Sequence, residues 1–70
     1  MAVTLTETVD YAIISLRVGV ILRRKRDKRE VYFQPGDAEA GIREIADAIN
    51  EHGDDRLKAH CAHVALSDYF

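Results

Sequence analysis

The longest apolar stretch of the chain begins at Tyr11, and from there to Leu22 every second position is apolar. A period of two is typical of a β-strand with one buried face, and branched Ile and Val side chains suit a pleated surface better than a helix. We therefore predict one long strand that buries its even-numbered side chains. These are Ala12, Ile14, Leu16, Val18, Val20 and Leu22, whereas the odd-numbered positions are mixed, with Ile13, Ser15, Arg17, Gly19, Ile21 and Arg23.

A second apolar run, Glu30–Gln34, follows a burst of basic residues and predicts the other arm of a β-hairpin. The first arm buries even-numbered residues, whereas the apolar residues of the second arm, Val31 and Phe33, are odd-numbered. Residues that face each other across the hairpin lie on the same face, so the numbers of each opposed pair have an odd sum. The segment Lys25–Lys28 lacks the Gly or Asn that a two-residue hairpin turn prefers, so a four-residue loop is predicted. The expected pairs are Val20 with Phe33, Leu22 with Val31, Arg23 with Glu30 as an ion pair, Arg24 with Arg29, and Ile21 with Tyr32 on the outer face.

The segment before the hairpin alternates only briefly, with Val3 and Leu5 apolar, and predicts a short third strand followed by a polar turn. An alternative is a helix capped by Thr6 or Thr8. Its face would be Val9, Ala12, Ile13 and Leu16, which also fit a period of 3.6. The β-branched composition after Tyr11 favours the strand.

Pro35 and Gly36 end the hairpin, because proline cannot donate to a sheet and glycine adopts turn geometry readily. A helix is predicted from Asp37, which would act as its N-cap, to Gly53, a left-handed C-terminal stop. Its apolar stripe is Ala38, Ile42, Ile45, Ala46 and Ile49.

A second helix is predicted from Arg56 to about Ser67, with Asp54 or Asp55 as its cap. Its apolar face would be Leu57, Cys61, Val64 and Ala65. A final strand is the alternative, because this segment also alternates. Tyr69 and Phe70 either fold back onto the core or form an exposed end.

These elements predict a single α+β domain spanning residues 1–70. A small antiparallel sheet, formed by the long hairpin with a third short N-terminal strand, would be covered on one face by one or two C-terminal helices. At 70 residues the core is barely sufficient, so self-association would stabilise the chain. One cysteine excludes an intramolecular disulfide, and no signal peptide or membrane-spanning run is evident, so we expect a cytoplasmic protein without a membrane partner.

The charge is distributed unevenly. The net charge is −2, but the segment 17–29 carries +6, which leaves −8 elsewhere. The expected partner-binding residues are the basic tip, Arg23, Arg24, Lys25, Arg26, Lys28 and Arg29, together with Ile21 and Tyr32 on the outer face. We expect neither Asp27 nor Glu30 to neutralise the tip. Such a tip protects a sheet edge from aggregation, or binds an acidic protein surface, or binds nucleic acid as a β-ribbon.

No catalytic, cofactor-binding or metal-binding residues are predicted. The chain has no nucleophile elbow, glycine-rich phosphate loop or dinucleotide fingerprint. His52, His60, Cys61 and His63 lack a recognised zinc spacing. We therefore expect no enzyme but a small interaction module, such as an adaptor, regulator or inhibitor, that binds an acidic protein partner or a second copy of itself as a homodimer. The alternative is a nucleic-acid-binding protein that uses the hairpin tip.

Overall fold

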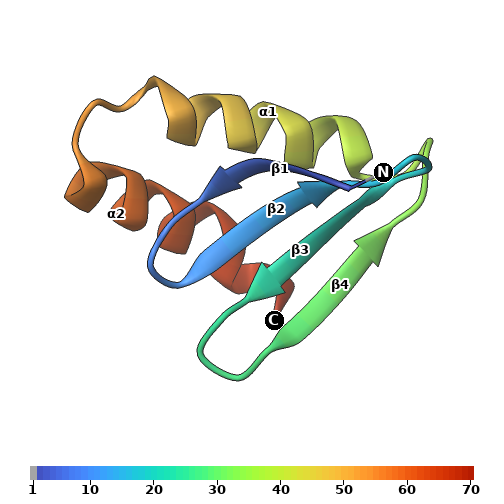
Figure 1. The fold of residues 1–70 in the computed structure, drawn as a ribbon, viewed down its shortest axis with the longest axis horizontal. Helices are drawn as coiled ribbons and strands as arrows, with labels where there is room; N and C mark the ends of the chain where they lie inside the picture. The colour runs from blue at the N-terminus through green and yellow to red at the C-terminus, as the bar shows by residue number, and fades with distance from the viewer. Residues whose placement is uncertain (1) are drawn as a thin grey trace.

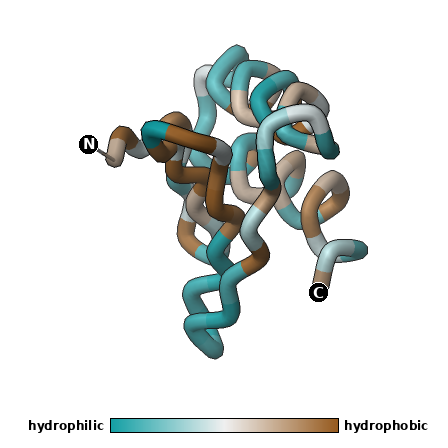
Figure 2. The backbone as a smooth tube through the Cα atoms, turned by 90° about the vertical axis from the view of Figure 1, so that its right-hand side faces the viewer, coloured by the Kyte–Doolittle hydropathy of each residue, from teal (hydrophilic) through white to brown (hydrophobic). Residues whose placement is uncertain are grey.

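The computed structural model describes residues 2–70 and shows a four-stranded antiparallel sheet followed by two helices (Figure 1). The strands follow one another in the sheet in the order β1-β2-β3-β4. Both helices lie on the same face, so the α+β class with one covered face is confirmed (Figures 1 and 2). The elements are β1 (Val3–Glu7), β2 (Tyr11–Ser15), β3 (Val20–Arg24), β4 (Arg29–Phe33), α1 (Glu39–Glu51), α2 (Asp55–Leu66) and a short 3₁₀ turn (Ser67–Tyr69).

The hairpin of β3 and β4 has the predicted register. Its pairs are Val20 with Phe33, Ile21 with Tyr32, Leu22 with Val31, Arg23 with Glu30 and Arg24 with Arg29. The four-residue loop Lys25–Lys28 joins the two strands, as expected. Lys28 adopts a left-handed backbone with a φ of 60°, which is uncommon for a residue with a Cβ.

The prediction of one long strand from Tyr11 is wrong. The chain reverses between Ser15 and Val20, so that β2 and β3 form a second hairpin. Gly19 permits this turn with a φ of +93°, and it packs against the ring of Tyr32 and the carbonyl of Phe33. The turn also exposes Val18, which was expected in the core.

The reversal changes which residues of β2 face the helices. Ile13 is paired with Leu22, and both are fully buried in the core. Ile14 is paired with Ile21 and therefore lies on the outer face. The even-numbered face is thus correct from Val20 onward but wrong for β2, where Ala12 is nevertheless buried at 5% exposure.

The short N-terminal strand is confirmed, and the alternative helix through Val9 and Leu16 is wrong. β1 contains an irregularity between Thr4 and Thr6, so its register with β2 shifts at Leu5. Asn50 of α1 holds this strand from the side. The Thr6 hydroxyl donates to Asn50 Oδ1 at 2.7 Å, and Asn50 Nδ2 donates to the Leu5 carbonyl at 2.8 Å.

Helix α1 buries most of its predicted stripe, with Ile42, Ala46 and Ile49 in the core and Ile45 packed against it. Its ends differ from the prediction. The N-cap position is Ala38, without a side-chain hydrogen bond, because the turn after Gly36 delays the first helical residue to Glu39.

At the other end of α1, the C-cap is His52 in an extended conformation. Gly53 is not left-handed, so the predicted glycine stop is wrong. Within the helix, Arg43 pairs with Glu39 one turn earlier, with Nε 2.8 Å from Oε1, and it also donates to the hydroxyl of Ser15 on β2. This bond ties α1 to the sheet.

Helix α2 is confirmed, and the alternative strand over 56–67 is wrong. Asp54 is its N-cap and accepts a bond from the Arg56 amide at 2.7 Å. Its buried face is Ala62 and Leu66, with Cys61 and Ala65 partly covered. Two residues of the expected apolar face, Leu57 and Val64, are instead exposed to 54% and 63%.

The two C-terminal aromatic residues fold back onto the sheet. The ring of Tyr69 meets that of Phe33 edge to face with 5.4 Å between centroids. The ring of Phe70 lies 6.1 Å from that of Tyr11. They extend the core toward β4, which α1 and α2 leave uncovered (Figure 1). Within residues 2–70, no helix is long and apolar enough to cross a membrane.

Candidate anion-binding hairpin tip

The six basic residues come together at the end of the β3–β4 hairpin. In Figure 2 this hydrophilic loop projects below the rest of the molecule, beyond both helices. Strand β3 contributes its last two residues, the loop contributes three, and β4 contributes its first. They are Arg23, Arg24, Lys25, Arg26, Lys28 and Arg29.

Three of the six cations are paired with carboxylates. Arg23 Nη2 lies 2.6 Å from Glu30 Oε2, as the cross-strand register requires. Arg24 holds both oxygens of Asp27, at 3.1 and 2.6 Å. The Arg23–Glu30 ion pair confirms the one predicted from the register. Together the two carboxylates offset two of the six positive charges, which the expectation for the tip left out.

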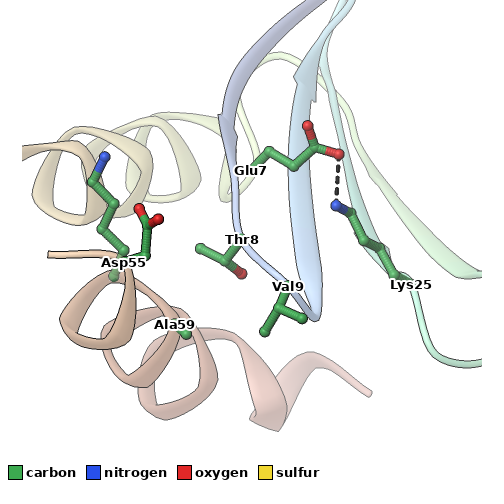
Figure 3. Close-up of a pocket in the computed structure, with 7 residues that line it drawn as sticks. Glu7, Thr8, Val9, Lys25, Asp55 and Ala59 are labelled. Carbon is green, nitrogen blue, oxygen red and sulfur yellow. Dashed lines mark ion pairs between the residues drawn. The ribbon is translucent and has the colours of Figure 1, made fainter.

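The third pair joins the tip to the first strand. Lys25 Nζ lies 2.6 Å from Glu7 Oε2 (Figure 3). Asp27 could have been identified from the sequence, because it stands three residues after Arg24 within a short loop. Glu7 had no such local signal, since only the sheet brings it beside Lys25.

The remaining three cations are Arg26, Lys28 and Arg29. All three are exposed, and none forms an ion pair with another residue in the range 2–70. Six cations against three carboxylates leave a local charge of +3, half of what the basic run alone suggests. The tip therefore carries less positive charge than the six basic residues of the sequence indicate.

Arg24 is the most enclosed of the paired cations. Its guanidinium carbon lies 4.8 Å from the centre of the Phe70 ring, a cation–π geometry. The hydrogen bond to Asp27 raises the pKa of Arg24 and lowers the pKa of Asp27 to about 2. Both groups stay ionised at neutral pH, so the Arg24–Asp27 ion pair stabilises the loop. The Arg24 side chain is therefore already engaged and is less accessible to a partner.

The outer side of the tip contains a shallow surface cleft. It has a volume of about 420 Å³ and is lined by Arg23, Lys25, Lys28 and Glu30. Three cations and one carboxylate line it, which suits an anionic group of a partner. Lys28 is the lining cation without an ion pair among the described residues.

A second cleft of about 360 Å³ lies between the β1–β2 turn and the start of α2 (Figure 3). Two lysines and two carboxylates balance its charge, and the Glu7–Lys25 pair already occupies one side. The hydrogen bond from Lys25 lowers the pKa of Glu7, so this pair remains ionised at neutral pH. The cleft has no charge preference and is the weaker candidate. It is lined by Glu7, Thr8, Val9, Lys25, Asp55, Lys58 and Ala59.

The two apolar candidates, Ile21 and Tyr32, lie on the outer face beyond the Arg23–Glu30 pair. Ile21 is half-buried between Ile14 and Tyr32, and Tyr32 is 48% exposed. The Tyr32 hydroxyl donates to the Val18 carbonyl at 2.8 Å, which fixes the ring over the β2–β3 turn. Neither helix covers this face (Figure 2).

The histidine and cysteine residues of α2 do not form a ligand set. Within residues 2–70 no three His, Cys, Asp or Glu side chains are placed to hold a metal ion. His63 Nδ1 instead lies 3.4 Å from the Tyr11 hydroxyl, and Cys61 is a partly covered free thiol.

Comparison with protein-family models, curated proteins and solved structures finds no match to this chain. Its function is therefore inferred from the geometry of the tip and the outer face.

Proposed function

We propose that this protein is a non-enzymatic interaction module that docks its hairpin tip on an acidic surface of another protein. The supporting observation is a group of three exposed cations, Arg26, Lys28 and Arg29, which form no ion pair within residues 2–70 and lie beside a cleft lined by three cations. An anionic side chain entering the cleft would meet Lys28 without first displacing an internal partner. An adaptor, a regulator or an inhibitor would use such a site.

The adjoining outer face supports a protein partner. Exposed Tyr32 and half-buried Ile21 lie on the same side of the sheet as the cleft. Aromatic and aliphatic groups beside a charged rim are the usual composition of a protein interface. A partner that covers both features would combine apolar burial with charge complementarity.

Nucleic acid is the second candidate, because β-ribbons enter DNA grooves and a basic tip attracts phosphate. Two features favour protein over nucleic acid. Only +3 of local charge remains at the tip after internal pairing, and residues 37–70, which contain both helices, carry eight carboxylates against three cations. A long polyanion that meets the tip would also approach this acidic layer and be repelled.

The test compares two probes, poly-L-glutamate and a generic DNA duplex, in a salt series followed by fluorescence anisotropy. A tip variant, R26S/K28N, removes two free cations. A matched control, R17S/R56S, removes the same charge elsewhere. Asparagine is chosen at position 28 because it tolerates the left-handed backbone there.

We expect poly-L-glutamate to bind the unaltered protein and the control about equally. The tip variant should bind about 2- to 30-fold more weakly, because exposed ion pairs are each worth roughly 0.2–1 kcal/mol. Equal losses in the tip variant and the control would exclude the tip as the docking site. Submicromolar binding of duplex DNA at physiological salt, lost in the tip variant, would favour the nucleic-acid function instead.

A further inference from the structure

The two edge strands of the sheet, β1 and β4, differ in how their outward backbone groups are paired. The β1 edge is irregular at Leu5, and the carbonyl of Leu5 already accepts a bond from Asn50. Strand β4 has β3 as its one neighbour, and no other element described in residues 2–70 pairs with its far side. Native proteins usually close or disrupt such an edge, because its free amides and carbonyls can pair with another strand.

The backbone pattern shows which groups of β4 point away from the sheet. The Lys25 amide donates to the Asp10 carbonyl at 2.8 Å, so this odd-numbered residue directs its backbone toward the β2 side. Backbone direction alternates along a strand, so Val20, Leu22 and Arg24 direct theirs toward β4. Their partners Phe33, Val31 and Arg29 face back toward β3. The amides and carbonyls of Glu30 and Tyr32 therefore point outward at the open edge.

Apolar side chains flank this edge on both faces. On the outer face Tyr32 is 48% exposed. On the inner face, half-buried Val31 lies beside Tyr69 and Phe70, and these residues, with Arg29 and Glu30, line a cleft of about 350 Å³. The helices do not extend over this part of the sheet (Figure 1).

We propose that a second copy of this chain pairs with β4 in antiparallel orientation across a two-fold axis. The two four-stranded sheets would then form one continuous sheet of eight strands. The antiparallel orientation sends the two basic tips to opposite ends of the new pair. A parallel arrangement would place two tips of charge +3 side by side.

The register of this pair is limited by face and by charge. Opposed residues must lie on the same face of the continuous sheet, so their numbers have an even sum. If the numbers of opposed residues sum to 58, Arg29 of one copy faces Arg29 of the other, and if they sum to 60, Glu30 faces Glu30. Both registers place like charges together.

A sum of 62 pairs Glu30 of each copy with Tyr32 of the other. This register gives a partner to every outward amide and carbonyl of β4, and it opposes Val31 to its own copy. A sum of 64 would instead oppose Glu30 to Gln34, whose carbonyl already accepts a bond from Asp37 at 3.1 Å. We therefore expect the pair to be centred on Val31.

The self-complementary edge favours a second copy as the occupant over an unrelated strand. The same four outward groups supply both sides of the ladder, and no charged residue needs a partner from elsewhere. The loop cations Arg26 and Lys28 lie outside the paired strand, so they stay available to an anion in the dimer, whereas Glu30 and Tyr32 take part in the pair itself.

The experiment is sedimentation equilibrium of the full chain, which has a mass of 7.9 kDa as a monomer. We expect the unaltered protein to approach twice this mass as its concentration rises. Glu30→Pro removes an outward amide and with it two of the four intermolecular hydrogen bonds, so the dimer should dissociate about 10- to 100-fold more readily. Proline is tolerated on an edge strand where its nitrogen faces solvent. Glu30→Ala is the matched control, because it also removes the ion pair with Arg23 but keeps the amide.

A second measurement guards against misfolding of the proline variant. In a Cys61→Ala background, Val31→Cys should form a disulfide-linked dimer under oxidised glutathione, and Tyr32→Cys should not, because Val31 alone opposes itself. A monomer at millimolar concentration, or cross-linking of Tyr32→Cys in preference to Val31→Cys, would overturn the proposed pair. Binding of an acidic probe by a monomeric protein would overturn the dimer and leave the tip function intact.

Discussion

Replacing Gly19 with alanine should be among the most destabilising single-methyl additions in this protein. Gly19 has a φ of +93°, in the region that L-residues with a Cβ rarely adopt. An added Cβ would lie 2.4 Å from the Phe33 carbonyl oxygen and 2.8 Å from a ring carbon of Tyr32. The oxygen belongs to the backbone of β4, so it cannot move aside without distorting the strand.

The chain offers two matched controls for the magnitude. Gly36 has a similar φ of +90° but open space around its Cβ position, so Gly36→Ala introduces backbone strain of about 1–2 kcal/mol without a steric clash. The clash at Gly19 adds about 1–3 kcal/mol, the usual cost of overpacking. Gly53 has open space and no left-handed backbone, so Gly53→Ala should stabilise the protein by about 0.4–1 kcal/mol through the unfolded state.

Urea denaturation followed by circular dichroism gives the free energy of unfolding of each variant. We expect the order Gly19→Ala, Gly36→Ala, Gly53→Ala from least to most stable, with the first two separated by about 1–3 kcal/mol. The unfolded-state contribution is common to all three and cancels in the differences. Equal losses at Gly19 and Gly36 would refute the close packing of the β2–β3 turn against β4.

Three further outcomes follow from the contacts described above. Lys28→Gly should stabilise the protein by about 0.5–1 kcal/mol, because it relieves the left-handed strain at 60° and costs only the greater unfolded-state entropy of glycine; a loss of stability in urea denaturation would contradict this. Asn50→Ala should lower the free energy of unfolding by about 1–3 kcal/mol, because it leaves the buried Thr6 hydroxyl unpaired. Adding Thr6→Val should recover part of this loss, and no recovery in the double variant would refute the Thr6–Asn50 hydrogen bond as its cause. The Asp27 pKa of about 2 lies below the ordinary value of 3.8, so the stability that ionised Asp27 contributes is complete above pH 3.8 and is lost as the pH falls through about 2. The urea midpoints of the wild type and of Asp27→Asn, measured between pH 5 and 2, should therefore converge as the pH falls.

The hairpin of β3 and β4 could be predicted in full because side-chain parity leaves few registers open. The turn before it was missed because Leu16 and Val18 continue the apolar alternation straight through the reversal. Gly19 was the one local signal, and a glycine within a strand pattern also fits a bulge or a close approach. In β2, three successive apolar residues, Ala12 to Ile14, gave no indication of which face is buried.

The helices, too, could be predicted only in part from the sequence. Their positions were predicted because caps and periodicity are local, as with Asp54 at the start of α2. The buried face of α2 was partly wrong, because Leu57 and Val64 fit the stripe as well as Ala62 and Leu66 do. Which stripe is buried depends on the elements against which α2 packs, and these include β2, which is far away in the chain.

The basic tip was visible in the sequence, but its remaining charge was not. Glu7 reaches Lys25 only because β1 and β3 flank the same strand. The candidate site thus carries less free charge than its six cations suggest, because among residues 2–70 only Arg26, Lys28 and Arg29 of the six lack an ion pair.

The order of the strands, in which each pairs with the next along the chain, bears on how quickly the protein can reach its native state. Every sheet contact closes only a short loop, so the meander has a low contact order and should form early. The bonds that close the structure join residues much farther apart in the sequence, with a separation of 44 positions for Thr6 and Asn50 and of 52 for Tyr11 and His63. If these long-range bonds form after the rate-limiting step, their loss would raise the unfolding rate and leave the refolding rate nearly unchanged. The lifetime of the native state would then be governed by the docking of the helices, and not by the hairpins on which they rest.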